Sequence, residues 1–334
     1  MAKVEESWDQ RPRCKQPLGS LLAGMRHGAS VHPGADTGRK KDRCIEKRNG
    51  MELLEVRNLS KYYKTFRLEN ISFMLPKGYI MGYVGQNGAG KSTTLNLITN
   101  ICKSSSGEIY VDGRSCNDDE SSYKETIGYI GDEFYFPDNF KVRHIRSVLN
   151  NFYKSFSTEK FDELVTRWKL DRKLEVKDFS QGMKVKLMFA SVLARETKLL
   201  VLDEATNGLD PVIRAEVLKI LQEYIADGER SVIFSTHILS DLEQIADYIF
   251  FIHEGKMVLY DAKDELMENH LLVKGERRAI FPELQKALIG ITDNAYGFEA
   301  ILPGDRADLL TNDFHFEKPT IDQIVIHYIK DREA

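Results

Sequence analysis

The segment Gly85-Gln86-Asn87-Gly88-Ala89-Gly90-Lys91-Ser92 most constrains the fold of this chain, because it matches the pattern G-x-x-x-x-G-K-S. Apolar residues 79–84 before it predict a buried strand, and residues 92–98 after it predict a helix. Backbone N–H groups in such a glycine-rich turn point at phosphates. We therefore expect residues 85–92 and Thr93 to bind a nucleotide, with Lys91 on its phosphates and Ser92 on Mg²⁺.

A second motif ends in two adjacent carboxylates. The apolar run Lys198-Leu199-Leu200-Val201-Leu202 predicts a strand of a parallel sheet that is buried on both faces, and Asp203-Glu204 follows it. Alone, this pair would fit a helix N-cap equally well. Beside a phosphate loop, Asp203 is expected to hold Mg²⁺, and Glu204 is placed to act as the general base that polarises a water molecule.

With these motifs the chain resembles the nucleotide-binding subunit of an ATP-binding cassette (ABC) transporter. The likeness covers roughly residues 51–262 and is greatest for subunits of ABC-2-type exporters, including the antibiotic and lantibiotic group. Its further motifs follow the family's order: Lys61-Tyr62-Tyr63 at the adenine loop, Ser180-Gln181-Gly182-Met183 at the signature, Asn207-Gly208-Leu209-Asp210 at the D-loop, and Ser235-Thr236-His237 at the switch histidine.

The resemblance implies an α/β fold: a P-loop NTPase core with a mainly parallel sheet, an antiparallel β edge subdomain and an α-helical signature subdomain. It implies ATP and Mg²⁺ as cofactors. Tyr63 is expected to stack on adenine, with Tyr62 or Phe66 as alternatives. His237 is expected to contact the γ-phosphate and to act in catalysis with Lys91 and Glu204.

The resemblance also implies that Ser180 and Gly182 bind the ATP of a second subunit, either another copy or a paralogue. A separate membrane-spanning permease would then carry out the export that ATP-driven dimerisation powers. The chain itself would lie at the cytoplasmic face of the membrane as a peripheral protein. Two other classes remain as alternatives, a soluble ABC-type ATPase of translation or DNA repair and a non-catalytic binding module.

Three motifs depart from the family pattern. In the signature, Phe179 precedes Ser180, while Gln181 and Met183 replace a Gly and a Gln. We expect Ser180 still to cap a helix that begins at Met183. Ala205 takes the position of a Pro, which removes a restraint on φ and no chemical group. Asp132 takes the position of the Q-loop Gln, and we expect it to be a third metal ligand.

Composition indicates which partners and which cellular compartment the chain fits. Residues 1–50 hold 11 Lys and Arg against 6 Asp and Glu, whereas residues 51–334 hold 36 against 45. Because residues 51–334 are acidic overall and contain no basic helix, nucleic acid is not expected as a partner. The apolar runs fall short of the ~20 residues that span a bilayer. The four cysteines lack C-x-x-C spacing, which favours reduced thiols.

The chain divides into three parts. Residues 1–50 have a composition typical of a disordered extension, or of translated sequence upstream of Met51. Residues 51–262 form the predicted ATP-binding domain, with helices over 143–156 and 161–168, another around 217–224, and a hairpin at Glu254-Gly255. Residues 263–334 are interpreted as a small structural tail that ends in a helix after Pro319.

Four aromatic residues follow the Q-loop within seven positions: Phe134, Tyr135, Phe136 and Phe140. Packing against the helix at 143–156 would explain part of this. Aromatic residues are also enriched at interface hot spots, and the family places this segment against the membrane subunit. We therefore expect Tyr135 and Phe136 to line a groove that receives a helix of that partner.

Overall fold

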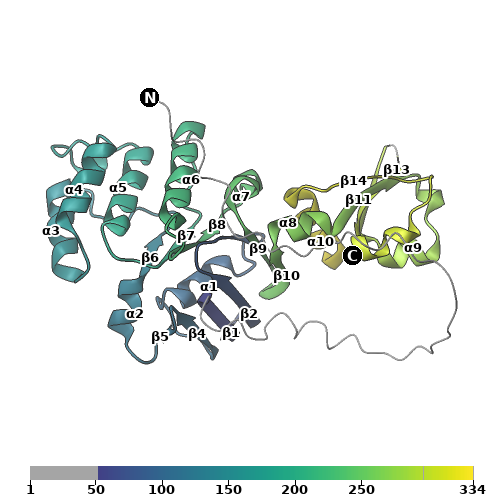
Figure 1. Ribbon diagram of the computed structural model, residues 1–334, viewed down its shortest axis with the longest axis horizontal. Coiled ribbons are helices and arrows are strands. Elements are labelled where there is room, and N and C mark those ends of the chain that lie inside the picture. Colours follow the sequence, from purple (N-terminus) through teal and green to yellow (C-terminus); the bar gives the residue numbers. More distant parts are fainter. Residues whose placement is uncertain (1–51, 296, 334) are drawn as a thin grey trace. The chain divides into compact units, whose positions relative to one another are not determined.

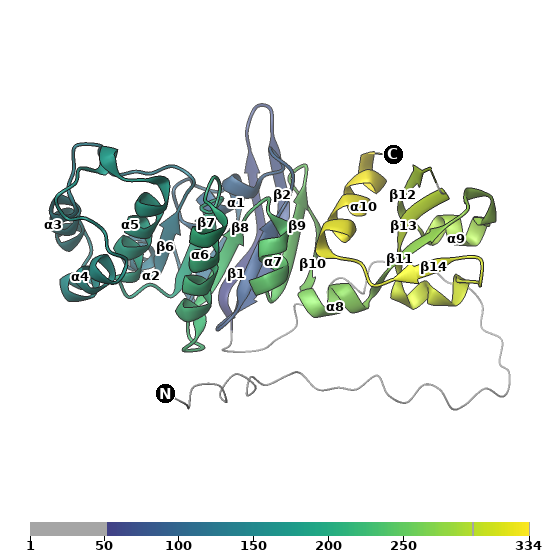
Figure 2. The same cartoon turned by 90° about the horizontal axis from the view of Figure 1, so that it is seen from above.

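The computed structural model describes residues 52–295 and 297–333, which form three sheets and the helices around them (Figures 1 and 2). The prediction about residues 1–50 lies outside the described residues.

The largest sheet is mainly parallel, as predicted. Its strands, in spatial order, are β10 (Lys256–Ala262), β9 (Tyr248–His253), β3 (Ile80–Val84), β8 (Ser231–Ser235), β7 (Leu199–Asp203) and β6 (Ile127–Ile130). The pairs from β9 to β6 are parallel, whereas β10 pairs antiparallel with β9. Every residue of β3, β7 and β8 is buried, as expected for parallel strands that are covered on both faces.

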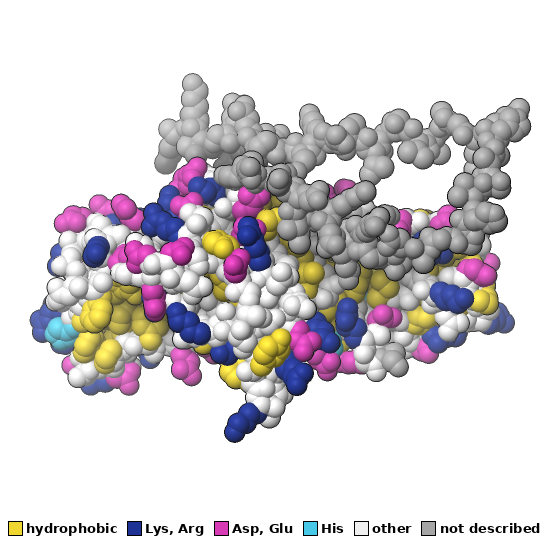
Figure 3. Space-filling view, turned by 90° about the horizontal axis from the view of Figure 1, so that it is seen from below, with side chains coloured by type: hydrophobic (Ala, Val, Ile, Leu, Met, Phe, Trp, Pro, Cys, Tyr) yellow, Lys and Arg dark blue, Asp and Glu magenta, His cyan; other side chains and the backbone are white. Residues whose placement is uncertain are grey.

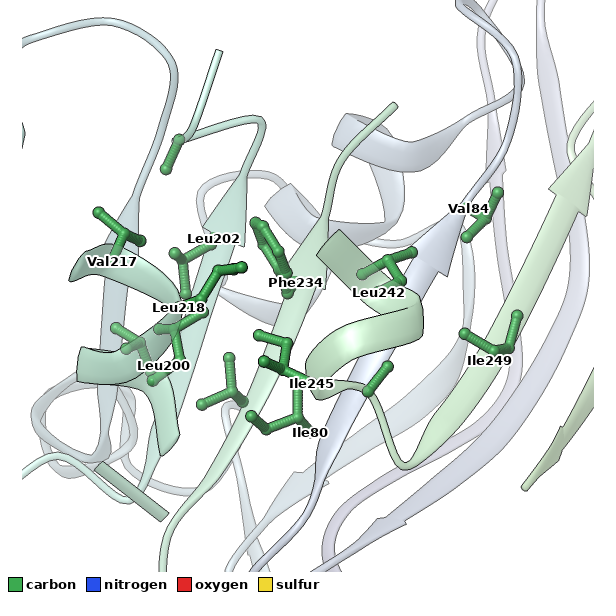
Figure 4. Packing of buried hydrophobic residues seen from close by; sticks show 14 of the residues in the cluster. Ile80, Val84, Leu200, Leu202, Val217, Leu218, Phe234, Leu242, Ile245 and Ile249 are labelled. Carbon is green, nitrogen blue, oxygen red and sulfur yellow. The ribbon is translucent and has the colours of Figure 1, made fainter. Parts of the chain in front are cut away.

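Helices cover one face of this sheet, whereas a second sheet with helices beside it covers the other. Leu200 and Leu202 pack against α5 (Gln181–Leu193), α6 (Pro211–Ile225) and α7 (Leu239–Ile245) (Figure 4). Leu199 and Val201 pack instead against α1 (Lys91–Ile98) and the second sheet, because alternate strand residues point to opposite faces.

The second sheet is the antiparallel edge subdomain that the resemblance implied. Its order is β2 (Arg67–Pro76), β1 (Glu52–Tyr62), β4 (Ser106–Val111) and β5 (Arg114–Ser115). Its strands β1 and β2 pair antiparallel. The turn from β1 to β2 carries Tyr63 and Phe66, with the Tyr63 N–H donating to the Phe66 carbonyl at 2.9 Å.

The helical subdomain lies between β6 and β7 in the chain. The helix α2 (Glu120–Thr126) comes before β6 in the chain. The subdomain itself consists of α3 (Val142–Phe152), α4 (Thr158–Arg167), a 3₁₀ turn (Val176–Asp178) and α5. Both predicted helices are therefore confirmed, with slightly earlier ends. The Ser157 hydroxyl accepts from the Lys160 N–H and caps α4. Apolar residues of α3, α4 and α5 share one core cluster.

The C-terminal region is a folded α+β unit, whereas the sequence analysis predicted only its last helix. Its elements are α8 (Lys263–Glu268), β11 (His270–Gly275), a 3₁₀ turn (Arg277–Ala279), α9 (Pro282–Ala287), β12 (Ile289–Asn294), β13 (Gly297–Pro303), a 3₁₀ segment (Gly304–Leu309), β14 (His315–Glu317) and α10 (Ile321–Glu333). The sheet is antiparallel in the order β12-β13-β11-β14. Val273, Phe298 and Leu302 belong to a core cluster within this unit, whereas Leu272 and Ile301 belong to the core cluster of the largest sheet.

The helix α10 joins this unit to the rest of the fold. The Ile321 N–H donates to the Glu243 carboxylate of α7 at 2.9 Å. Ile321 and Ile324 belong to the same core cluster as Ile245 of α7. The predicted helix after Pro319 is thus confirmed, and its apolar face completes the core beside α7.

The buried β8 strand gives a direct test of this core. Val232 is fully buried, whereas Val212 in the first turn of α6 is 69% exposed. Val232→Ala should lower the free energy of unfolding by about 2 kcal/mol or more, because it leaves a cavity between packed layers. Val212→Ala is the matched control and should change it by less than about 0.5 kcal/mol. Denaturant titration measures the free energy of unfolding of both variants. Equal losses in the two would contradict the assignment of β8 to the buried layer.

Candidate nucleotide-binding and hydrolysis site

The phosphate loop connects β3 to α1, as the motif predicted. Gly90 is the residue before α1 and has a φ of 112°, a left-handed value that favours glycine. A Cβ atom at Gly90 would also meet the Phe66 ring at 2.9 Å. The first turn of α1 therefore presents its free backbone N–H groups to the loop, an arrangement that binds anions.

Lys91 is a buried cation inside this loop. Its side chain is 5% exposed and its Nζ donates to the Gly85 carbonyl at 2.8 Å and to the Gln86 carbonyl at 3.3 Å. Glu204 Oε1 lies 3.5 Å from Nζ. The ammonium group is therefore held by the loop and by the carboxylate that follows β7, in the position from which it can contact phosphates.

Asp203 is the last residue of β7 and is nearly buried. Burial raises the pKa of Asp203, while hydrogen bonding to Ser92 lowers this pKa and the Glu204 charge raises it. Within the described residues, Oδ1 of Asp203 has no hydrogen-bond partner. A hydroxyl and a carboxylate with a free oxygen are hard oxygen ligands, so Ser92 and Asp203 fit Mg²⁺.

Glu204 is held in a left-handed conformation, with a φ of 55°. Its N–H donates to the Ser235 carbonyl of β8 at 3.0 Å, which ties the residue to the neighbouring strand. Its Oε2 accepts from the Asn207 amide at 2.6 Å and lies 3.7 Å from His237 Nδ1. The structure thus brings Lys91, Glu204 and His237 together, as the sequence predicted.

Asp132 is less well supported as a metal ligand than Ser92 and Asp203 are. It is an exposed residue just after β6. Its charge raises the pKa of Asp203, although less than burial does, so the two side chains are within electrostatic reach. Yet no three His, Cys, Asp or Glu side chains cluster closely enough for a metal in the part of the chain that the structure describes. Asp132 therefore does not join Asp203 and Glu204 in a three-carboxylate cluster.

Small-molecule pockets measure about 300–1,000 Å³. The pocket beside the phosphate loop, at about 580 Å³, lies within this range. It is lined by Tyr63, Thr65, Phe66, Asn87, Gly88, Gly90, Lys91, Ser92, Thr93 and Glu204. Tyr63 and Phe66 therefore stand at the loop, whereas Tyr62 does not line the pocket. Thr65 was missed because a single threonine in a turn carries no pattern.

Ser180 and Gly182 lie in a different pocket, of about 400 Å³, that also contains Gly208, Leu209 and Asp210. The Ser180 hydroxyl accepts from the Met183 N–H at 3.3 Å and caps α5, as predicted, although α5 begins at Gln181 and not at Met183. The two pockets share no lining residue. The phosphate loop and the signature residues thus lie in separate pockets of the chain.

Comparison with known proteins adds to this geometry. The family model described as ABC transporter matches residues 68–207, which contain the phosphate loop, Ser180 and both carboxylates. The lantibiotic transport ATP-binding protein of Streptococcus pyogenes is 35% identical over 245 residues, covering 67% of this chain and all of that protein. A bacitracin transport ATP-binding protein of Bacillus licheniformis is 30% identical, covering 66% of this chain and 71% of that protein. A solved ATP-binding subunit of an ABC transporter is similar with a TM-score of 0.59 and 27% identity, over 65% of this chain and 92% of that one.

The pocket geometry assigns different roles to two neighbouring tyrosines. Tyr63→Ala should weaken ATP binding by ~1–3 kcal/mol, because it removes an aromatic ring that stacks on the base. Tyr62→Ala is the matched control and should leave the affinity unchanged. Titration with a fluorescent ATP analogue measures both. A loss confined to Tyr62→Ala would move the adenine contact out of this pocket.

Proposed function

We propose that this chain, which belongs to the ATP-binding proteins of ABC transporters, powers export by a separate membrane-spanning subunit. The chain is an ATPase of that family. The convergence of Lys91, Glu204 and His237 on the phosphate loop is the observation that carries the proposal. A soluble ATPase of translation or DNA repair is not favoured, since the relatives are named for transport.

Each residue of the site has a distinct task in hydrolysis. Lys91 leaves its loop carbonyls and binds the β- and γ-phosphates, while backbone N–H groups of the loop hold the remaining phosphate oxygens. Ser92 and Asp203 hold Mg²⁺, which supplies charge neutralisation when bound. Glu204 accepts a proton from the attacking water, and His237 contacts the γ-phosphate. Tyr63 fixes the base.

A second copy of this chain completes the site. Ser180 and Gly182 line a pocket that is separate from the phosphate-loop pocket, so in this structure they do not contribute to the nucleotide pocket of their own chain. The capped N-terminus of α5 presents further backbone N–H groups, which suit the γ-phosphate of a partner's ATP. Because each copy contains both halves, two copies in head-to-tail arrangement form two complete sites.

The export partner is a membrane-spanning subunit, and this chain attaches to it at the cytoplasmic face. Within the described residues no helix is both long and apolar enough to cross a bilayer. The relatives that transport lantibiotics and bacitracin support export of a peptide antibiotic as the process.

A groove of about 300 Å³ between β6, α3 and α5 is the proposed docking surface. Tyr135, Ile101 and Leu149 line it, and the Arg195 guanidinium stacks 3.6 Å from the Tyr153 ring at its wall. Tyr135 and Ile101 are about half exposed or more. Figure 3 shows hydrophobic side chains gathered at the end of the molecule that α3, α4 and α5 form.

Phe136 does not share this role, in contrast to the expectation from sequence. It does not line the groove and packs with Phe134 and Phe140 against the core of the helical subdomain. The groove prediction therefore rests on Tyr135.

Glu204→Gln tests the catalytic assignment. The variant should still bind Mg-ATP but should lose ~10²–10⁴-fold in turnover, because an amide cannot act as the general base. It should also accumulate as an ATP-bound dimer in sedimentation experiments. Glu223→Gln, at an exposed ion pair on α6, is the matched control and should retain full turnover. Undiminished turnover in Glu204→Gln would refute the assignment.

The groove is tested by replacing its exposed apolar side chains. The double variant Tyr135→Ser with Ile101→Ser should bind ATP normally but co-purify at least about tenfold less with the membrane subunit, since aromatic anchors dominate interfaces. Tyr110→Ser, on β4 and outside the groove, is the control. Normal co-purification of the double variant, with its ATP binding intact, would place the docking surface elsewhere.

A further inference from the structure

The side-chain amide of Asn207 makes the shortest contact of the Glu204 carboxylate. Asn207 Nδ2 lies 2.6 Å from Glu204 Oε2, whereas Lys91 and His237 lie 3.5 and 3.7 Å from the carboxylate oxygens. Hydrogen bonds to an ionised acceptor are shorter and stronger than neutral ones. This one therefore has the geometry of a strong restraint on the carboxylate.

The chemistry of the pair fixes the orientation of the amide. An ionised carboxylate only accepts hydrogen bonds, so the NH₂ group of Asn207 must face Glu204 and its carbonyl oxygen must point away. An Asp at this position would have the same shape but no donor. It would also place a second negative charge next to Glu204.

The backbone around the pair is already fixed by other hydrogen bonds. The Glu204 N–H is bound to Ser235, and the Asn207 N–H donates to the Glu204 carbonyl at 3.1 Å, which closes a turn over residues 204–207. The turn does not need the Asn207 side chain. What the side chain adds is a further restraint on the Glu204 carboxylate, whose side chain is 23% exposed.

The restraint also determines where the other carboxylate oxygen points. With Oε2 held by Asn207, Oε1 lies 3.5 Å from Lys91 Nζ, at the phosphate loop. A general base must lie within hydrogen-bond reach of the water whose proton it takes. Holding one oxygen thus keeps the other on the side where the γ-phosphate and its attacking water meet.

We propose that Asn207 is a positioning residue for Glu204, whose amide turns one carboxylate oxygen toward the attacking water. This role rests on the proposed function, because it presumes that Glu204 is the base. Asn207 touches neither nucleotide nor metal in this role, so it affects the chemical step and not ATP binding.

Two variants of the purified protein separate this role from simple packing. Asn207→Ala removes the donor and should lower kcat about tenfold, the order that one hydrogen bond to a charged group supplies. Asn207→Asp keeps the shape but replaces the donor with a repelling charge, so it should lower kcat further, by about a hundredfold. KM for ATP should stay within about twofold in both. Asn151→Ala, at an exposed position of α3, is the control.

Which of the two variants loses more kcat decides between a positioning role and a packing role for Asn207. A packing role predicts that Asn207→Asp, which preserves the shape, is the milder change; that order, or an unchanged kcat in both, would overturn the proposal. Loss of ATP-driven dimer formation when either change is added to Glu204→Gln would also overturn it, because Asn207 would then serve the pocket of Gly208 and Asp210. If Glu204→Gln itself retains turnover, the assignment of the base fails, which is a separate result from these.

Discussion

The parallel register of β3, β8 and β7 is the constraint on which the site depends. Tyr83 pairs with Ser235, and Ser235 pairs with Asp203, so the three strands end at one edge of the sheet. The phosphate loop, the two carboxylates and His237 each begin within a few residues of those ends. Groups that lie more than 100 residues apart in the chain meet because parallel strands bring their carboxyl ends together. Burial of these strands on both faces keeps that edge rigid.

The charges at this edge bear on the proposed dependence of hydrolysis on a second subunit. Lys91 is satisfied by its own loop and by Glu204, so a phosphate competes with groups that are already in place. Glu204 is held from a second side by Asn207, on the segment that continues into the pocket of Ser180. Residues 204–210 thus run from Glu204 to one wall of the signature pocket. In the proposed dimer, a partner that binds this pocket would contact residues close to Glu204.

The sequence predicted those parts of the fold where pattern and chemistry coincide. The phosphate loop, the buried strand before Asp203 and the amphipathic helices α3 and α4 all follow from local signals. The sheet of residues 270–317 was missed because its strands are short and of mixed pattern, although the alternation of Phe298, Ala300 and Leu302 after Gly297 was a usable signal. The Asn207 contact and the inward packing of Phe136 depend on side-chain directions that only the tertiary structure specifies.

In the proposed dimer, each complete site combines the phosphate loop of one copy with Ser180 of another. Mixing two inactive proteins, one with Lys91→Ala and one with Ser180→Arg, tests this directly. A mixed dimer contains one intact site, formed by the loop of the Ser180→Arg copy and the signature of the Lys91→Ala copy. The account predicts that ATPase activity rises on mixing, well above that of either protein alone. A mixture that hydrolyses ATP no faster than the average of the two would contradict it.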